Sequence, residues 1–132
     1  QKLAMPLAIV DKRRQKANSS EVMNIIGDVR DKHVILLDDM VDTGGSLCHA
    51  AKALVDIGKA KSVTACATHG LLSGPAVQRI SDSVLDEVVF LDTIPPKPGM
   101  KCDKIRYISV AHLFAEAISH IYEETSVSRL FS

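Results

Sequence analysis

Apolar residues along the chain occur in two patterns, and these patterns alternate from one end to the other. Short runs of apolar residues predict strands over residues 7–10, 34–37, 62–68, 84–91 and 105–110. Apolar residues spaced three and four positions apart predict helices over residues 46–57, 74–80 and 113–121. Strands that alternate with helices form parallel crossovers, so we expect an α/β fold with three layers, an open and mostly parallel sheet with helices on both faces.

The remaining segments complete this pattern. Residues 34–37 are apolar without alternation, which is typical of a strand covered on both faces. Residues 21–26 predict a short strand or edge element. Residues 11–20, D-K-R-R-Q-K-A-N-S-S, are polar and basic with no apolar period, so we expect a loop there. The sequence P-P-K-P-G at 95–99 marks a second, exposed loop.

Length and charge limit the classes of function. With 132 residues, the chain is expected to form a single domain over residues 1–132. Lys plus Arg and Asp plus Glu number 16 each, so no overall field attracts nucleic acid or an anionic membrane. No apolar run approaches the roughly 20 residues of a membrane span, and no signal-peptide pattern precedes the first strand. We therefore expect a soluble, cytoplasmic protein without nucleic-acid or membrane partners.

The cysteines and histidines do not form a ligand pattern. Cys48, Cys66 and Cys102 are odd in number, widely spaced and without a C-x-x-C pair, so we expect three reduced thiols. The histidines at 33, 49, 112 and 120 have no partner at ligand spacing. No metal-ligating residue is therefore predicted in this chain.

Two carboxylates stand at the predicted end of a buried strand. Asp38 and Asp39 follow V-I-L-L at 34–37, and in an open parallel sheet ligands bind beyond the carboxyl ends of the strands. Such a pair can chelate a metal ion, share a proton, or accept hydrogen bonds from a vicinal diol of a sugar. The residues that follow the pair discriminate among these roles.

A small-residue turn suited to anions follows, D-T-G-G-S at 42–46. Gly44 and Gly45 let the backbone approach a ligand, the helix from Ser46 adds a partial positive charge, and Thr43 adds a hydroxyl donor. A diol-binding pair before a phosphate cradle predicts a ribose 5-phosphate site; the simpler alternative is a tight strand-to-helix turn with an N-cap. The chain has neither G-x-x-x-x-G-K-[ST] nor G-x-G-x-x-G, so Walker-type and dinucleotide sites are not indicated.

Residues 35–47 resemble the signature of the type I phosphoribosyltransferase fold. Further stretches are similar to the C-terminal half of ribose-phosphate pyrophosphokinases, and the resemblance covers nearly the whole chain. These stretches are D-K-R-R at 11–14 with E-V-M-N-I-I-G-D-V at 21–29, A-T-H-G-L-L-S-G-P-A at 67–76, and S-V-S-R-L-F at 126–131.

The resemblance implies an enzyme of nucleotide biosynthesis. Such enzymes transfer the pyrophosphoryl group of ATP to the 1-hydroxyl of ribose 5-phosphate, with Mg²⁺, forming phosphoribosyl pyrophosphate and AMP. They are expected to be homo-oligomers, hexameric in the intact enzyme, and to hold ATP and Mg²⁺ largely through the N-terminal half and a neighbouring subunit. The resemblance therefore implies that this chain supplies the ribose 5-phosphate site and the catalytic loop but is inactive alone.

The site residues follow from the resemblance, residue by residue. The flexible catalytic loop falls on residues 11–20, where Lys12 and Arg14 match cations that stabilise the transferred group. The acids that bind the ribose hydroxyls fall on Asp38 and Asp39. The 5-phosphate loop falls on Asp42, Thr43, Gly44, Gly45 and Ser46. Positioned positive charge on a mobile loop suits such a transfer, although a K-R-R sequence in a polar loop is, taken alone, typical of a solvated patch.

Two alternatives belong to other functional classes. A nucleobase phosphoribosyltransferase would share the 5-phosphate loop but break a bond at C1, and it should carry a hood for the base in place of D-K-R-R. A non-catalytic regulatory subunit would keep the fold while losing the catalytic cations or the loop, and Lys12, Arg14 and D-T-G-G-S argue against this.

Other candidates carry less weight. His69 would border the substrate site or be satisfied by backbone contacts in its turn, and Asp92 and Thr93 at another strand end invite the same two interpretations. Ser126 and Ser128 either join a regulatory site or lie in a C-terminal arm docked through its last apolar residues.

Overall fold

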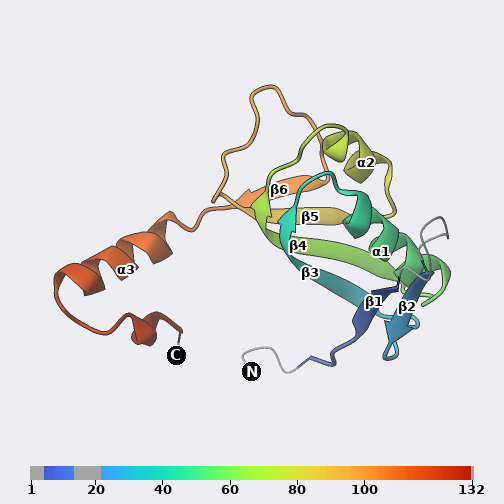
Figure 1. Ribbon diagram of the computed structural model, residues 1–132, viewed down its shortest axis with the longest axis horizontal. Coiled ribbons are helices and arrows are strands. Elements are labelled where there is room, and N and C mark those ends of the chain that lie inside the picture. Colours follow the sequence, from blue (N-terminus) through green and yellow to red (C-terminus); the bar gives the residue numbers. More distant parts are fainter. Residues whose placement is uncertain (1–4, 14–21, 132) are drawn as a thin grey trace.

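The computed structural model describes residues 5–13 and 22–131 of the chain (Figure 1). Its elements are, in order, β1 (Ile9–Arg13), β2 (Val22–Ile26), β3 (His33–Val41), α1 (Gly45–Asp56), β4 (Ser62–Gly70), α2 (Ala76–Asp82), β5 (Glu87–Leu91), β6 (Ile105–Ile108), α3 (Ala111–Tyr122) and the 3₁₀ helix η1 (Val127–Phe131).

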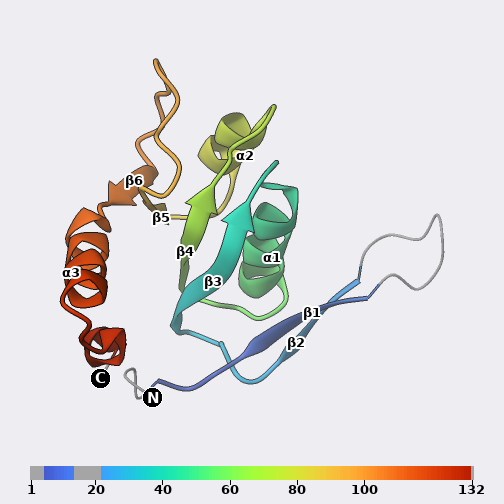
Figure 2. The ribbon, with the colours of Figure 1, turned by 60° about the vertical axis from the view of Figure 1, so that its left-hand side comes forward.

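A parallel sheet forms the centre of the fold, with strands in the order β3-β4-β5-β6. Its register places Val34 beside Val63 and Asp38 beside Ala67. Helices α1 and α2 cover one face, and α3 lies on the side away from them (Figure 2). The predicted α/β class with an open, mostly parallel sheet is therefore confirmed.

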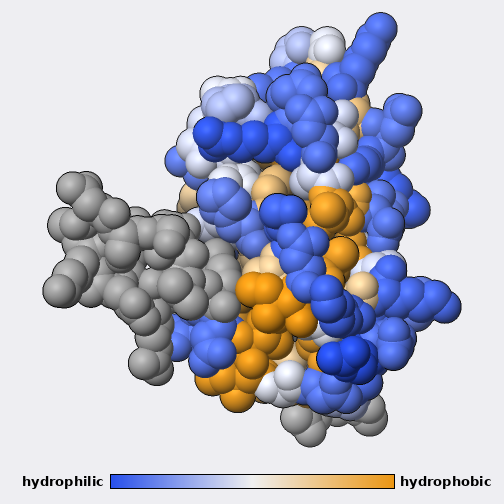
Figure 3. Space-filling model, turned by 90° about the vertical axis from the view of Figure 1, so that its right-hand side faces the viewer, coloured by the Kyte–Doolittle hydropathy of each residue, from blue (hydrophilic) through white to orange (hydrophobic). Residues whose placement is uncertain are grey.

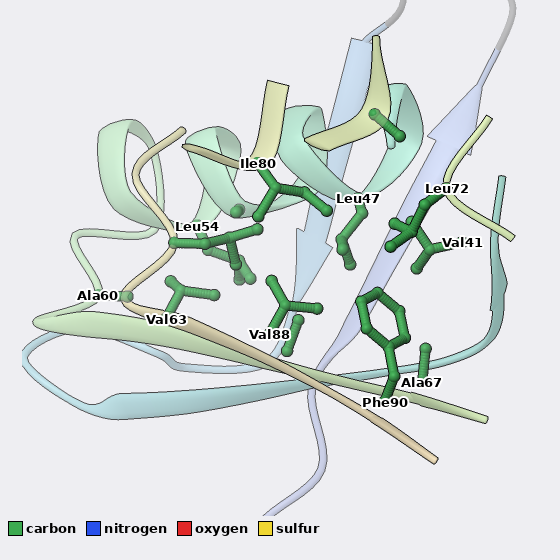
Figure 4. Close-up of a cluster of buried hydrophobic side chains, with 14 of the residues drawn as sticks. Val41, Leu47, Leu54, Ala60, Val63, Ala67, Leu72, Ile80, Val88 and Phe90 are labelled. Atoms are coloured by element: carbon green, nitrogen blue, oxygen red, sulfur yellow. The ribbon is translucent and has the colours of Figure 1, made fainter. Parts of the chain in front are cut away.

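The core lies between this sheet and the two covering helices (Figure 4). Val63 and Val88 point from the sheet toward Leu54 of α1 and Ile80 of α2, and all four are almost completely buried. Alternate residues of β4 and β5 are buried, as expected for strands covered on this face. This packing fixes the positions of α1 and α2 relative to the carboxyl ends of the strands.

The first two strands form an antiparallel hairpin of their own, in which Ile9 pairs with Ile26 and Lys12 with Met23. The predicted strand over residues 7–10 is therefore displaced to residues 9–13 and does not join the parallel sheet. The predicted loop over residues 11–20 is wrong for its first three positions, because cross-strand pairing with β2 extends the polar sequence D-K-R as a strand. Residues 14–20 lie outside the described part of the chain.

Part of the apolar surface is not covered. The apolar run of β3 predicts a strand buried on both faces. This prediction is wrong, because Ile35 is 49% exposed and Leu37 is 75% exposed. Helix α3 has no buried residue, and a continuous hydrophobic patch is visible on one side of the molecule (Figure 3). β3 is also an edge strand of the described sheet. The fold thus presents apolar surface and an unpaired strand edge.

The remaining features concern the membrane and the cysteines. None of the helices in the described ranges is both long and apolar enough to cross a lipid bilayer. Cys48, Cys66 and Cys102 are free thiols. Burial raises the pKa of the Cys48 and Cys66 thiols.

Candidate functional site

The two adjacent acids lie within β3, because this strand continues four residues beyond its predicted end, to Val41. The two acids are adjacent in this strand, and their carboxyl groups are close enough to interact with each other. The register places Asp38 beside the buried Ala67, on the face covered by helices. The backbone N–H of Asp39 donates to Oδ1 of Asp38 at 2.9 Å. Burial, and then the neighbouring Asp39 carboxyl, raise the pKa of Asp38.

The predicted phosphate loop connects β3 to α1. Helix α1 begins at Gly45, and its N-cap residue Gly44 has φ 73° and ψ −3°, the left-handed conformation that favours glycine. The N-cap residue is a glycine and so provides no side-chain cap for this helix. The first N–H groups of a helix have no acceptor within the helix, and together with the helix dipole they favour an anion. The turn therefore has the chemistry of an anion site.

Backbone carbonyl groups at the start of the same loop accept hydrogen bonds from the segment between β4 and α2. The Val41 carbonyl accepts from the N–H groups of Leu71 and Leu72, at 3.0 and 3.1 Å. The Asp42 carbonyl accepts from the N–H of Ser73 at 2.8 Å. Successive carbonyl groups at the end of β3 are thus held by one neighbouring segment.

A side chain of α2 continues this series. Nη1 of Arg79 donates to the Thr43 carbonyl at 3.0 Å, while a Cβ on Gly44 would lie 3.5 Å from the carbonyl oxygen of Ala76. We call these hydrogen bonds, between residues 41–43 and residues 71–79, the supporting contact. The sequence did not indicate Arg79 as a site residue, since its proximity to the loop depends on how α2 packs beside α1.

A cavity of about 840 Å³ extends along β3 from the amino end of the hairpin. It is lined by residues 5–10 and 32–38 and by residues of α1 that include Ser46 and Leu54. Asp38 and Ser46 are the predicted site residues that line it. Most of the other lining side chains are apolar, so the cavity as a whole does not have the lining that a sugar phosphate needs.

The predicted site residues are thus only partly brought together. Residues 42–46 form one contiguous turn at the carboxyl end of β3, and Asp38 reaches the same cavity as Ser46. The backbone of Lys12 lies in β1, whereas its side chain and all of Arg14 lie outside the described part of the chain. The two predicted catalytic residues therefore have no described position relative to the turn.

His69 takes part in a hydrogen-bonded chain at the carboxyl end of β4. The Thr93 hydroxyl donates to the Thr68 carbonyl, and Nδ1 of His69 lies 2.8 Å from the same hydroxyl oxygen. Because the hydroxyl proton is used by Thr68, Nδ1 of His69 must be the donor to Thr93. These two hydrogen bonds fix the imidazole ring, and in a neutral ring Nε2 is then the acceptor nitrogen.

Asp92 has a structural role at the start of α3. The Ser109 hydroxyl and then the Val110 N–H donate to its carboxylate and lower its pKa, the latter at 2.8 Å. Ser126 and Ser128 hydrogen-bond to each other through their hydroxyl groups. The contacts of Asp92 favour its structural interpretation.

Within residues 5–13 and 22–131, no group of three or more His, Cys, Asp or Glu side chains could hold a metal ion. Asp38 and Asp39 are adjacent, but two carboxylates do not by themselves make such a group. The donor set present therefore does not fit a resident metal ion held by this part of the chain alone.

The fold and the turn define an α/β domain with an open parallel sheet and an anion-type turn between β3 and α1. The model of the phosphoribosyl synthetase-associated domain matches residues 5–132, and the chain belongs to this family.

Named relatives agree with this assignment. The ribose-phosphate pyrophosphokinase of Clostridium acetobutylicum is 58% identical over 131 residues, which are 99% of this chain and 41% of that protein. The ribose-phosphate pyrophosphokinase of Caldanaerobacter subterraneus is 59% identical over 132 residues, which are 100% of this chain and 42% of that protein. This chain thus spans about two fifths of the length of these relatives.

A solved structure has the same fold. The crystal structure of phosphoribosylpyrophosphate synthetase from Mycobacterium smegmatis superposes with a TM-score of 0.77 at 37% identity, covering 90% of this chain and 37% of that one. The similarity supports the α/β architecture described above.

Proposed function

We propose that this chain provides the ribose 5-phosphate site of a ribose-phosphate pyrophosphokinase. In the proposed reaction the 1-hydroxyl oxygen of ribose 5-phosphate bonds to the β-phosphorus of ATP, the bond from that phosphorus to the α,β-bridging oxygen breaks, and AMP leaves. The hydroxyl proton is released, and the product is phosphoribosyl pyrophosphate. The names of the relatives that match nearly the whole chain at 58% and 59% identity support this reaction.

The observation that carries the proposal is the turn at residues 42–46. Its N-cap Gly44 is left-handed and has no side chain to cap α1, and the preceding carbonyls are hydrogen-bonded on the other side. A 5-phosphate placed at this helix N-terminus would accept from N–H groups of Gly45 and its neighbours. Asp38 and Asp39 would accept hydrogen bonds from the ribose hydroxyls.

Lys12 and Arg14 are the proposed catalytic cations. The backbone of Lys12 lies in β1, and Arg14 follows this strand in the sequence. Their charges would stabilise the nonbridging oxygens of the pyrophosphoryl group as it is transferred.

ATP and Mg²⁺ are proposed to bind mainly through residues outside this chain. Mg²⁺, when bound, neutralises charge on the phosphates of ATP, and the described residues offer no ligand set for it. ATP and ribose 5-phosphate are the proposed partners of the complete enzyme, which we propose to be cytoplasmic and a hexameric homo-oligomer.

We further propose that residues 1–132 are one phosphoribosyltransferase-like domain that works with additional polypeptide. The chain spans 41% and 42% of the two relatives described above. The edge of β3 adjoins the largely apolar cavity of about 840 Å³, and Ile35 and Leu37 are exposed on the sheet. Apolar surface of this kind is typical of a site that packs against further protein.

Calorimetric titration of the chain with ribose 5-phosphate tests the site, with ribose as the control that lacks the phosphate. Binding of ribose 5-phosphate that is at least about tenfold tighter than binding of ribose, a difference of about 1.4 kcal/mol, is expected. Equal affinities would contradict the phosphate loop.

A chimera tests the reaction. Residues 1–132 would replace the matching segment of the Clostridium acetobutylicum relative, of which they are the counterpart over 131 residues. Formation of AMP from ATP that depends on ribose 5-phosphate is expected. A chimera that instead joins a nucleobase to C1 of phosphoribosyl pyrophosphate would favour the nucleobase phosphoribosyltransferase.

A further inference from the structure

The side chain of Arg79 lies against the predicted phosphate loop, although it comes from the next helix along the chain. Its Nη1 donates to the Thr43 carbonyl at 3.0 Å, and a Cβ on Gly45 would lie 3.7 Å from the same nitrogen. Arg79 is exposed, so burial does not explain this position. The contact joins residues 36 positions apart in the sequence.

We propose that Arg79 is a positioning residue of the phosphate loop: its hydrogen bond to the Thr43 carbonyl holds the turn with its N–H groups directed to the 5-phosphate. This inference deepens the function proposed above and rests on it. It gives α2, and the A-T-H-G-L-L-S-G-P-A segment that leads into it, a role in ribose 5-phosphate binding.

The physical basis is the geometry of a peptide unit. The carbonyl of Thr43 and the N–H of Gly44 belong to one planar group and point in nearly opposite directions. Fixing the carbonyl oxygen toward Arg79 therefore fixes the Gly44 N–H away from Arg79. Gly44 has a left-handed backbone conformation, and glycine can adopt many other backbone conformations at little cost. The hydrogen bond from Arg79 selects one of them before ligand binds, which lowers the entropy lost on binding.

The backbone of the same segment acts in the same direction. The carbonyls of Val41 and Asp42 accept from residues 71–73, but these bonds end one residue before Thr43. Arg79 is therefore the described donor that extends the series into the turn itself. The base of Arg79 is anchored in turn, because its N–H donates to the Pro75 carbonyl at 2.9 Å.

The positive charge of Arg79 also lies near the turn, and two variants separate the effect of its hydrogen bond from the effect of its charge. Arg79→Met keeps the length of the side chain and removes its donors. Arg79→Lys keeps the charge and a donor without the planar fork. Arg106→Met is the matched control, since Arg106 is an exposed cation that pairs with Glu87 at 3.0 Å and not with the loop.

The experiment is calorimetric titration of the 132-residue chain and its variants with ribose 5-phosphate, with the melting temperature of each protein measured without ligand. Arg79→Met should bind ribose 5-phosphate at least about tenfold more weakly than the unaltered chain, with a melting temperature changed by no more than about 2 °C, since exposed substitutions have small effects on stability. Arg79→Lys should recover part of the affinity, and Arg106→Met should bind normally.

Each other outcome has a definite meaning. If the unaltered chain binds ribose 5-phosphate and Arg79→Met binds within twofold of it, the positioning role is overturned while the proposed function stands. If the unaltered chain does not distinguish ribose 5-phosphate from ribose, both fail. If Arg79→Met does not fold, Arg79→Lys decides, and normal affinity in that variant together with a lowered melting temperature would assign Arg79 a purely structural role.

Discussion

Gly70 at the end of β4 faces the ring of Phe90 on β5, and a Cβ on Gly70 would lie 3.0 Å from ring atoms of Phe90. Phe90 is completely buried, so its ring is closely packed and a methyl group on Gly70 would have to displace it. The φ of Gly70 is not positive, so the preference for glycine at this position comes from packing against the ring and not from backbone conformation.

The first prediction concerns this contact. Gly70→Ala should lower the free energy of unfolding by about 1–3 kcal/mol, the usual cost of overpacking a core. In the background of Phe90→Leu, which makes room beside Gly70, the same change should cost less than half as much. Chemical denaturation of the four proteins measures this coupling. Equal costs in the two backgrounds would mean that the ring and the new methyl group do not meet.

The second prediction separates the two glycines of the turn. Gly44→Ala places a side chain on a residue with φ 73°, which should destabilise the chain by about 1–2 kcal/mol. Gly45 has no such conformation, and a Cβ there would meet nothing closer than 3.7 Å. Gly45→Val should therefore fold normally but lower the affinity for ribose 5-phosphate at least about tenfold, since a branched side chain crowds the backbone where the phosphate approaches.

Thermal unfolding and calorimetric titration check the two effects on the same proteins. An unaltered affinity in Gly45→Val would place the phosphate elsewhere.

The third prediction concerns Lys12. In the chimera, Lys12→Ala should lower kcat by roughly 10² to 10⁴ while KM for ribose 5-phosphate changes little, because the charge acts on oxygens that gain negative charge during transfer. Lys52→Ala is the matched control, since Lys52 pairs with Asp56 on the surface of α1. Steady-state kinetics of AMP formation measures both. An unchanged kcat in Lys12→Ala would mean that Lys12 has no catalytic role and that the D-K-R-R stretch is a solvated patch.

The fourth prediction is a dependence on pH at the start of α3. The Ser109 hydroxyl and the Val110 N–H stabilise the ionised form of Asp92 and lower its pKa from 3.8. A lowered pKa means that this stabilisation is fully present above the ordinary value and is lost as the pH falls through the pKa of the folded state. The Val110 amide resonance should therefore titrate below pH 3.8. In Asp92→Asn, which keeps an acceptor but not the charge, that titration should be absent.

The fifth prediction concerns the chain without additional polypeptide. It should bind ribose 5-phosphate through residues 42–46, which are contiguous in sequence, but form no AMP from ATP, Mg²⁺ and ribose 5-phosphate, because the proposed ATP site lies elsewhere. Chemical shift changes at Thr43 and Gly45 and an assay for AMP test the two parts. AMP formation by the purified chain that depends on ribose 5-phosphate would contradict the division of the active site.

Sequence patterns predicted local structure better than they predicted burial. The helical spacing that begins at Leu47 gave α1 within one residue at each end, because it records which face meets the core. The apolar run at 34–37 predicted a strand correctly but not its exposure, since Ile35 and Leu37 are exposed on the face away from α1 and α2. What covers a strand depends on other elements, and a single strand's composition does not determine their placement.

The candidate site shows the same division. The turn at 42–46 was predictable because its glycines and its helix start are adjacent in sequence. Arg79 was not, because its approach to Thr43 depends on the docking of α2. Gly58, which follows α1, depends on packing in the same way: a Cβ there would lie 2.6 Å from Cγ2 of Val29, so close packing requires glycine at this position, and its φ is not positive.

The supporting contact also constrains the order in which the molecule assembles. Its bonds join the end of β3 to residues roughly thirty positions later in the chain, so they close long loops and form only after β4 and α2 are in place. The turn can therefore reach the conformation that binds a phosphate only late in folding. Occupation of the turn should conversely slow hydrogen exchange in α2, a helix that need not touch the ligand, because opening α2 would first require the ligand to leave.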